Sequence, residues 1–388
     1  MFIGIIGAPN KGKSTFFSAI TSLDISIADY PFTTIKPNVG TTYFVKPCPE
    51  KELNLKCKPR NSLCINGNRR IPIKIVDVAG LVPDANSGKG MGNQFLNDLS
   101  GADALILVVD ISGETDELGN PTKNHNAISD IQFIQNELIT WLSNIIKSHI
   151  TSISKLQDGV SALKSILSSF KANEIQIKKA ADEANVVLSY ITWGDVSIKK
   201  FSECFIKLNK PMVVVANKLD KSNNEKVKEL ADKLKNIKVI GCSAAIELAL
   251  IKAANSGAVS YSPGDSTFIV NTKDEEKLKA LEYIKKYLEK NNDTGIQKTI
   301  NYVVESLLEQ IVVYPVENEN KYTDHFGNVL PDAILIKKGS TAIELASKIH
   351  TDLAEKMIYA LDARSKNRLS KEYILKDNDI IKIVSAAK

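Results

Sequence analysis

A run of residues near the N-terminus has the types and spacing needed to bind nucleotide phosphates. Residues 7–14 are GAPNKGKS and match the pattern G-x-x-x-x-G-K-[ST] at every fixed position. They follow an apolar segment that predicts a strand and precede one that predicts a helix, which is the context of a phosphate-binding loop. Successive backbone N–H groups and a helix N-terminus form an anion site there, and Gly12 lets the backbone approach the phosphates closely. We expect a nucleotide to contact Asn10, Lys11, Gly12, Lys13, Ser14 and Thr15.

Further groups could hold a metal ion and stabilise the charge that develops when the terminal phosphate is cleaved. Lys13 can reach the β- and γ-phosphates, and Ser14 can ligand Mg²⁺. The segment Asp77-Val78-Ala79-Gly80 ends a predicted strand, so Asp77 can hold the metal through water while the Gly80 N–H contacts the γ-phosphate. Lys13 and Gly80 are therefore the catalytic candidates.

Residues 30–34, YPFTT, offer hydroxyl groups between these two motifs. We favour Thr34 over Thr33 as the residue that completes the Mg²⁺ shell when the γ-phosphate is present, which is the order–disorder geometry of nucleotide switches. The alternative is that both threonines lie in an ordinary solvated loop. The predicted metal ligands are Ser14, Thr34 and Asp77.

A third motif, Asn217-Lys218-Leu219-Asp220, predicts a guanine site. An aspartate after a strand can accept hydrogen bonds from guanine N1–H and N2–H₂, whereas adenine has no N1–H, and such a site can discriminate by roughly 10⁴–10⁵. Lys218 would lie along the base plane, and Asn217 would tie this loop to the phosphate loop. Backbone N–H groups of Ser243 and Ala244 could reach guanine O6. The alternative for the motif on its own is a polar turn.

The elements that position these motifs are five apolar segments, which predict strands over residues 2–6, 73–78, 104–110, 212–216 and 238–241. Continuous apolar strands separated by helical stretches indicate a parallel sheet covered on both faces. Ligands of such sheets bind at the carboxyl ends of the strands. Each motif follows such an end or lies in a loop that can reach it.

About 100 residues separate Asp110 from Met212, more than a single crossover helix needs. Apolar residues spaced by three and four over 131–145 and 153–170 predict two helices that pair as an antiparallel hairpin, and further helices are expected around 180–191 and 198–208. We expect these apolar positions to form the core of the insertion itself; the alternative is a projecting coiled coil that contacts a partner. From about residue 311 the pattern predicts a small mixed β/α unit.

Composition excludes several classes of protein. The chain has 388 residues, enough for two or three domains, and its 43% hydrophobic and 24% charged residues exclude disorder as the main state. No run of about 18 apolar residues predicts a membrane span, and no basic stretch at the N-terminus indicates a secretory signal. Five irregularly spaced cysteines suit a reducing cytosol rather than a disulfide scaffold. The net charge of +5 is compatible with an RNA-rich partner and equally with none.

Weaker signals remain open. Cys48, Cys57 and Cys64 do not have C-x-x-C zinc spacing, so we expect a local loop packed on the sheet edge; the alternative is a metal site or redox switch. A basic run without interleaved aromatics predicts a solvated face, with RNA contact as the alternative: Arg364, Lys366, Arg368 and Lys371. The histidines are scattered and receive no catalytic role.

Taken together, GAPNKGKST, YPFTTIKPNVG, DVAGLVPDANSGKGMGNQFL, NKLD, CSAAIELAL and the C-terminal unit resemble the Obg-related GTPases, most closely the YchF-like branch. The resemblance covers essentially the whole chain. It implies an α/β fold with a Ras-like P-loop GTPase domain and a mostly parallel sheet over 1–115 plus 210–310. It also implies a helical or coiled-coil insertion over 116–209 and a β-grasp TGS domain over 311–388. A cytoplasmic protein associated with ribosomes or other RNA–protein particles is expected, through the TGS and helical domains and without membrane contact; the oligomeric state is not decided.

The expected activity is hydrolysis of GTP to GDP and phosphate with Mg²⁺, in a nucleotide-dependent switch. Leu81 stands where Ras-like enzymes usually place a water-orienting glutamine, so turnover should be slow or depend on another group. Asn10 matches the asparagine that ligands K⁺ in potassium-activated GTPases; the alternative is that it only shapes the loop. Two alternative functions stay open. One is a YchF-type ATPase, although NKLD is the standard guanine motif, and the other is a nucleotide-dependent binding module with negligible turnover.

Overall fold

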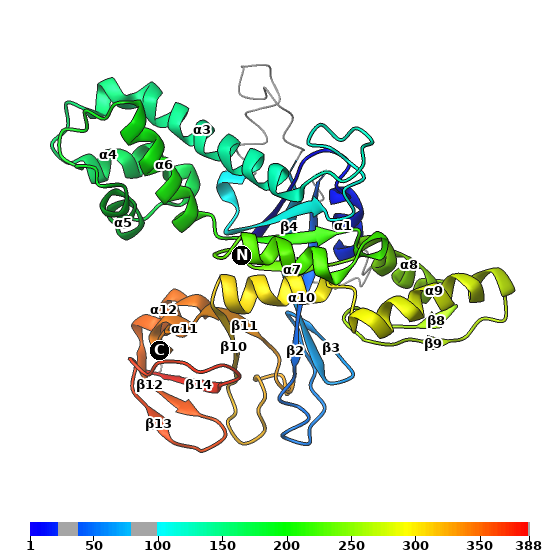
Figure 1. The fold of residues 1–388 in the computed structure, drawn as a ribbon. Coiled ribbons are helices and arrows are strands. Elements are labelled where there is room, and N and C mark those ends of the chain that lie inside the picture. Colours follow the sequence, from blue (N-terminus) through cyan, green and yellow to red (C-terminus); the bar gives the residue numbers. More distant parts are fainter. Residues whose placement is uncertain (22–37, 79–98, 387–388) are drawn as a thin grey trace. The chain divides into compact units, whose positions relative to one another are not determined.

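The computed structural model describes residues 1–21, 38–78 and 99–386, drawn as coloured ribbon in Figure 1. The described residues form two compact units. The first comprises 1–21, 38–41, 74–78 and 99–299, and the second comprises 42–73 and 300–386. Predictions for Thr34, Gly80 and Leu81 lie outside the described residues.

Within the described residues, seven strands form one sheet in the order β2-β4-β1-β5-β6-β7, with β3 beside β4. β1 is parallel to β4 and β5, and β5, β6 and β7 continue in parallel, whereas β3 is antiparallel to β4. This confirms the mostly parallel sheet that the apolar segments predict. The strands are β1 (Phe2–Ile6), β2 (Val39–Pro47), β3 (Leu63–Ile65), β4 (Asn68–Asp77), β5 (Ala104–Asp110), β6 (Met212–Asn217) and β7 (Val239–Gly241).

Helices lie between these strands and after β7, and a small hairpin also follows β7. The helices are α1 (Lys13–Thr21), α3 (Ala127–Ile153), α4 (Gly159–Ile166), α5 (Glu174–Ala184), α6 (Asp195–Asn209), α7 (Asn224–Lys233), α8 (Ala244–Asn255), α9 (Glu275–Asn291) and α10 (Ile296–Tyr302). The hairpin consists of β8 (Val259–Ser260) and β9 (Ile269–Val270). None of the helices in the described part of the chain is long and apolar enough to cross a membrane.

The two paired helices expected after Asp110 are confirmed only in part, since α4 packs against α3 but is shorter than the apolar stretch over 153–170. α3 is long, but the second apolar stretch is divided into α4, which Asp158 caps, and a 3-10 turn that ends at Lys171 in the left-handed region. A capping box between Asn173 and Gln176 then begins α5. α6 packs against both α3 and α5, which gives the helical region of Figure 1.

The apolar side chains of this helical region do not form a separate core. One buried cluster runs from Leu105 and Leu107 on β5 to Leu138 and Trp141 on α3 and on to Phe201 on α6. The Trp141 and Phe170 ring centroids lie 5.0 Å apart, within the usual range for aromatic pairs. The helical region is therefore packed on the sheet, and the expectation of an independent core for the insertion is wrong.

The second unit contains the small β/α fold expected near the C-terminus. Among the described residues its sheet has the order β11-β10-β14-β12-β13, and β10 is parallel to β14. Leu345 and Ala346 of α11 pack against Val313 of β10 and Ile381 of β14 in one buried cluster. The elements are β10 (Gln310–Pro315), β11 (Ile334–Lys337), α11 (Ala342–Ile349), α12 (Thr351–Glu355), β12 (Met357–Asp362), β13 (Arg368–Leu369) and β14 (Ile380–Ser385).

Residues 42–73, which the expected domain boundaries assign to the phosphate-binding domain, belong to this second unit. Backbone hydrogen bonds explain the assignment. The Lys58 N–H donates to the Val329 carbonyl at 2.8 Å, and the Arg60 N–H donates to the Pro331 carbonyl at 2.7 Å. The loop between β2 and β3 is therefore held by residues far along the chain.

Candidate nucleotide site

The phosphate loop joins β1 to α1, and its two fixed glycines occupy positions where a side chain would not fit. A Cβ at Gly7 would lie 2.6 Å from the Val108 carbonyl oxygen of β5. Gly12 has a φ of +85°, and a Cβ there would lie 2.3 Å from Nδ2 of Asn217. The Gly12 carbonyl accepts the Phe16 N–H at 2.9 Å, so α1 begins directly after the loop. This is the strand–loop–helix geometry that presents backbone N–H groups to phosphates.

The structure brings Lys13 and Asp77 together at the carboxyl ends of β1 and β4. The Lys13 Nζ lies 2.8 Å from Oδ1 of Asp77. The Asp77 N–H donates to the Asn38 carbonyl at 2.8 Å, which fixes the end of β4. Ser14 is exposed beside this pair, and Thr15 is half-buried. Hydroxyl and carboxylate oxygens are the donor types that Mg²⁺ prefers, so the described ligand candidates fit that ion.

Side chains of the phosphate loop are held by the segment that follows β5. The Asn10 Nδ2 donates to the Gly119 carbonyl at 2.9 Å, and the Lys11 Nζ donates to the Thr115 carbonyl at 2.8 Å. The Lys11 side chain is fully buried, and its Nζ also lies 2.8 Å from Oδ2 of Asp130 at the start of α3. The Lys11 side chain is therefore engaged within the protein, and only its backbone N–H can contact a phosphate.

Asp130 and His125 complete this buried network, and sequence reasoning missed both. The His125 Nε2 lies 2.9 Å from Oδ1 of Asp130, whose side chain is only 1% exposed. The signal available in the sequence is that Asp130 adjoins Ile131 in the apolar stripe of α3, next to Ile134. A carboxylate in such a stripe requires a buried partner.

The base loop is joined to the phosphate loop through Asn217, as its position after β6 predicts. Its Nδ2 donates to the Lys11 carbonyl at 3.1 Å, and its Oδ1 accepts the Ala244 N–H at 3.1 Å. Asn217 is almost fully buried. One side chain therefore sets the distance between the loops expected to hold phosphate and base.

Lys218 is fixed by a second buried carboxylate. It has a left-handed φ of 63°, and its Nζ lies 2.8 Å from Oδ2 of Asp110 at the end of β5. Burial alone would raise the pKa of Asp110, but hydrogen bonds from Lys218, Ser112 and Thr115 hold that pKa below its ordinary value. Asp110 is therefore a charged anchor that orients the lysine stem.

Asp220 is oriented by Ser243, whose Oγ donates to its Oδ1 at 2.5 Å. The Ser243 N–H donates to the Thr294 carbonyl at 2.9 Å, and the Ala244 N–H is already bonded to Asn217. The two backbone donors expected to reach guanine O6 thus have internal acceptors, because they also connect the base loop to its neighbours. An O6 contact would have to share these donors.

Beneath the base loop lies a buried acid that has no counterpart in the predicted site. Glu247 of α8 accepts hydrogen bonds from Tyr261 Oη at 2.8 Å and Thr294 Oγ1 at 2.5 Å. Burial raises the pKa of Glu247 above its ordinary value, in spite of these two hydrogen bonds. The Thr294 carbonyl also accepts the Ser243 N–H. The contact between Glu247 and Thr294 therefore helps to hold Ser243, the residue that orients Asp220.

Comparison with known families agrees with this geometry over most of the chain. The profile described as 50S ribosome-binding GTPase matches residues 2–154. The profile described as Obg-like GTPase YGR210-like, G4 motif-containing domain matches residues 215–318, and the TGS domain profile matches residues 326–385.

Individual relatives extend over nearly the full length. A GTP-binding protein of Methanocaldococcus jannaschii is 48% identical, covering 100% of this chain and 99% of the relative. The crystal structure of a GTP-binding protein from Pyrococcus horikoshii OT3 covers 100% of both chains at 38% identity, with a TM-score of 0.82. Obg-like ATPase 1 of Rattus norvegicus is 29% identical over 98% of this chain and 91% of its own. The chain therefore belongs to the Obg-like GTPases, in the YGR210-like and YchF-related group that carries a C-terminal TGS domain.

Proposed function

We propose that this protein binds GTP with Mg²⁺ and slowly hydrolyses it to GDP and phosphate, and that the bound nucleotide sets a switch. The observation that carries the proposal is the Asn217 side chain, which links the Lys11 carbonyl of the phosphate loop to the Ala244 N–H behind the base loop. Lys13 and Asp220 then lie on the two loops that this one side chain connects. Such an arrangement suits a ligand with phosphates at one end and a purine at the other.

The phosphate end would be held by the loop N–H groups and by Lys13. A triphosphate would compete with Asp77 for the Lys13 ammonium, which lies 2.8 Å from that carboxylate. Ser14 and Asp77 would hold Mg²⁺, with Thr34 as the third proposed ligand. The ion would supply positive charge against the phosphate oxygens. Thr15 would stand at the start of α1, where the helix N-terminus favours the same anion.

The base end favours guanine. Ser243 donates to Asp220 Oδ1, so the carboxylate is oriented as an acceptor for paired donors such as guanine N1–H and N2–H₂. Lys218, held by Asp110, would supply its stem along the base plane. The Methanocaldococcus jannaschii relative is named a GTP-binding protein, which supports this choice. ATP is the second candidate, because the rat relative is named an ATPase.

Hydrolysis is expected to be slow because Leu81 offers no hydrogen-bonding group for water. The Gly80 N–H is the proposed contact to the γ-phosphate. The Asn10 Nδ2 donates to the Gly119 carbonyl, which supports a loop-shaping role, whereas a K⁺ ion would be bound by Oδ1 of the same side chain. A single-turnover assay of GTP hydrolysis in K⁺ and in Na⁺, with wild type and Lys13→Ala, tests these points. We expect slow phosphate release that Lys13→Ala abolishes and that is similar in the two salts.

Two results of this assay would contradict the proposal in different ways. Tight GTP binding without any phosphate release would favour a nucleotide-dependent binding module. GTP hydrolysis that is about tenfold or more faster in K⁺ than in Na⁺ would show that a monovalent cation stabilises negative charge in the transition state. Asn10 would then have a catalytic rather than a loop-shaping part.

We propose a ribosome or another RNA–protein particle as the partner, contacted through the TGS and helical regions. The profile over residues 2–154 is described as ribosome-binding, which supports this choice. The basic run is a weaker basis for it, since Arg364 bonds to Glu52 and Lys366 donates to the Ala363 carbonyl. Co-sedimentation with ribosomes, with a non-hydrolysable GTP analogue or with GDP, should show binding in one nucleotide state only. Equal binding in both states would contradict the switch.

A further inference from the structure

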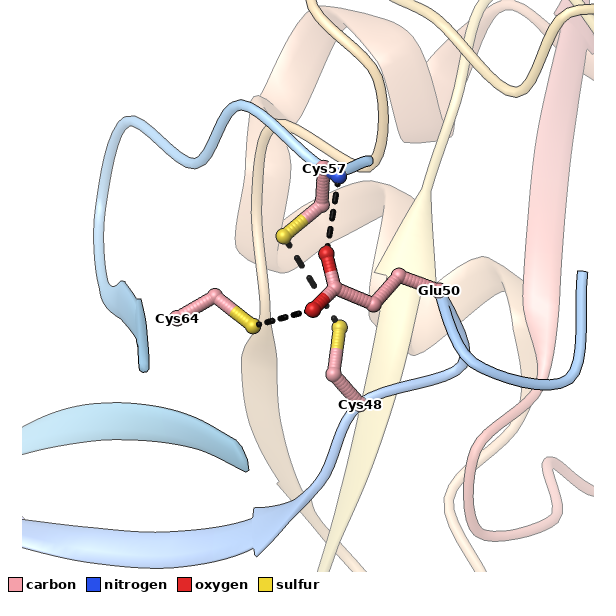
Figure 2. Close-up of side chains that lie close together, drawn as sticks. All are labelled: Cys48, Glu50, Cys57 and Cys64. Carbon is pink, nitrogen blue, oxygen red and sulfur yellow. Dashed lines mark hydrogen bonds between the residues drawn. The ribbon is translucent and has the colours of Figure 1, made fainter. Parts of the chain in front are cut away.

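Three cysteines and a glutamate converge in the second unit (Figure 2). Cys48 follows β2, Glu50 and Cys57 lie in the loop over residues 48–62, and Cys64 lies in β3. One ligand atom from each side chain lies within 4.8 Å of all the others. Among the described residues, this is the one group of three or more histidine, cysteine or acidic side chains with such spacing.

We propose that Cys48, Cys57, Cys64 and Glu50 together bind one Zn²⁺ ion. In a tetrahedral zinc site with Zn–S distances near 2.3 Å, two sulfur ligands lie about 3.8 Å apart. The Cys48 and Cys57 sulfurs lie 4.0 Å apart, so little movement is needed. All three cysteines are free thiols, and this separation is far longer than the roughly 2.0 Å of a disulfide bond.

The glutamate is already oriented for this role, as Figure 2 shows. Its Oε2 accepts the Cys57 N–H at 2.8 Å, which fixes the carboxylate. Its Oε1 accepts the Cys64 thiol at 3.1 Å and thus faces the sulfurs. Zinc binding would replace that thiol proton and leave the Oε2 hydrogen bond in place. In protein metal sites, a ligand is typically oriented by a hydrogen bond to the side-chain atom that does not bind the metal.

A buried arginine would offset part of the charge of the zinc-bound site. Zn²⁺ with three thiolates and one carboxylate carries a net charge of −2, which is costly to hold in a partly buried place. Arg69 of β4 is fully buried and lies opposite Cys64 in the antiparallel pairing of β3 with β4. Its guanidinium is fixed by hydrogen bonds to Ser62 Oγ at 3.1 Å and to the Leu330 carbonyl at 2.7 Å. This fixed cation lies beside the site whose negative charge it would partly offset.

The donor set also indicates which metal and which role. Three thiolates favour zinc over the hard ions Mg²⁺ and Ca²⁺. Four protein ligands leave no open position, which is typical of structural zinc. The ion would crosslink a long loop without helix or strand, residues 48–62, to β3, and so stabilise a segment in which residues 51–61 are exposed or half-buried. This inference is independent of the proposed function at the nucleotide site.

The test is a metal titration of the full-length protein. The chain is stripped with a chelator under reducing conditions, and ZnCl₂ or CoCl₂ is added while nucleotide binding is followed on the same samples. We expect one equivalent of Zn²⁺ to bind, and Co²⁺ to show the visible absorption of a tetrahedral, thiolate-bound ion. Cys57→Ser and Cys64→Ser should each weaken zinc binding by at least about 100-fold.

Two further variants guard against effects on folding. Cys204→Ser changes a cysteine of α6, outside the cluster, and should leave zinc binding unchanged. Glu50→Gln keeps all three sulfurs, so it should weaken zinc binding while the cobalt spectrum still shows thiolate ligation. Absence of stoichiometric zinc binding by the wild type would overturn the proposal. So would equal affinity of Cys57→Ser and Cys204→Ser, or a Cys48–Cys57 disulfide that forms in air and is unaffected by excess Zn²⁺.

Discussion

Replacing Lys11 by methionine should destabilise the first unit far more than a loop substitution would. Lys11 is fully buried, and its Nζ lies 2.8 Å from Oδ2 of Asp130, which is 1% exposed. The contact between Lys11 Nζ and Asp130 Oδ2 is an ion pair whose geometry does not meet that of a hydrogen bond. Lys11→Met keeps most of the side-chain volume but leaves the Asp130 carboxylate buried beside His125 alone. Removing one partner of a buried pair costs about 3–5 kcal/mol.

Thermal unfolding of the full chain, followed by circular dichroism and by loss of nucleotide binding, measures this effect. For a unit of this size, about 3–5 kcal/mol corresponds to a fall in Tm of roughly 6–20 °C. The matched control is Lys147→Met, which removes an ammonium group from an exposed ion pair. The Lys147 Nζ lies 2.8 Å from Oδ1 of Asp195, and the two side chains are 57% and 76% exposed. That control should change stability by less than about 1 kcal/mol.

The double variant Lys11→Met/Asp130→Asn removes the buried charge that the single variant leaves. It should recover part of the lost stability, so that the two changes are coupled by more than about 1 kcal/mol. Additive effects, or a Lys11→Met variant as stable as Lys147→Met, would refute the claim that this ion pair holds the phosphate loop against α3.

Three further predictions concern the base, the loop and pH. Asp220→Asn should weaken GTP binding and favour XTP, because an amide N–H₂ can donate to the xanthine C2 carbonyl; a competition assay with both nucleotides measures the exchange. Gly12→Ala should abolish nucleotide binding in the same assay, since its Cβ would lie 2.3 Å from the Asn217 amide at a φ of +85°. Burial lowers the pKa of Lys210 to about 8 in the folded chain. The ordinary pKa of a lysine in the unfolded chain is near 10.4, so between about pH 8 and pH 10.4 the unfolded chain binds more protons than the folded chain. The free energy of unfolding should therefore rise with pH over this range, by up to about 3 kcal/mol. Denaturant titrations measure this rise, and Lys210→Met should remove it.

The strands of the phosphate-binding sheet could be predicted because their signal is local. β5 is buried at every position and apolar up to its last residue, Asp110, and β1 runs directly into the glycines of the phosphate loop. β2 gives no such signal, since it mixes polar and apolar residues and only part of it is buried. Its place in the sheet follows from pairing with β4, which is far from it in the sequence.

The helical region shows why spacing alone was insufficient. The apolar residues over 153–170 have helical spacing, but Asp158 and Gly159 form a helix start within them, and Asp158 accepts the Ser161 N–H. The cap divides the stretch, and the shorter helices then pack on α3 and on each other. Local capping outweighed periodicity here.

The buried partners of the site were hidden for a different reason. Asp110 and Lys218 meet through the pairing of β5 with β6, and Lys11 meets Asp130 across more than 100 positions. The cysteine cluster is similar, because Cys64 joins Cys48 and Cys57 only once β3 and the loop over 48–62 have folded. Residue types indicated the chemistry, whereas the partners depended on contacts between distant segments.

The measurement that tests the central claim most directly is a competition between GTP and ATP for the wild-type protein. A fluorescent nucleotide is bound in Mg²⁺ buffer and displaced by each competitor. If Asp220, oriented by Ser243, selects the base, GTP should displace the probe at concentrations lower by orders of magnitude. Equal or better displacement by ATP would contradict guanine selection and favour the alternative of a YchF-type ATPase in spite of the Asn-Lys-Leu-Asp motif.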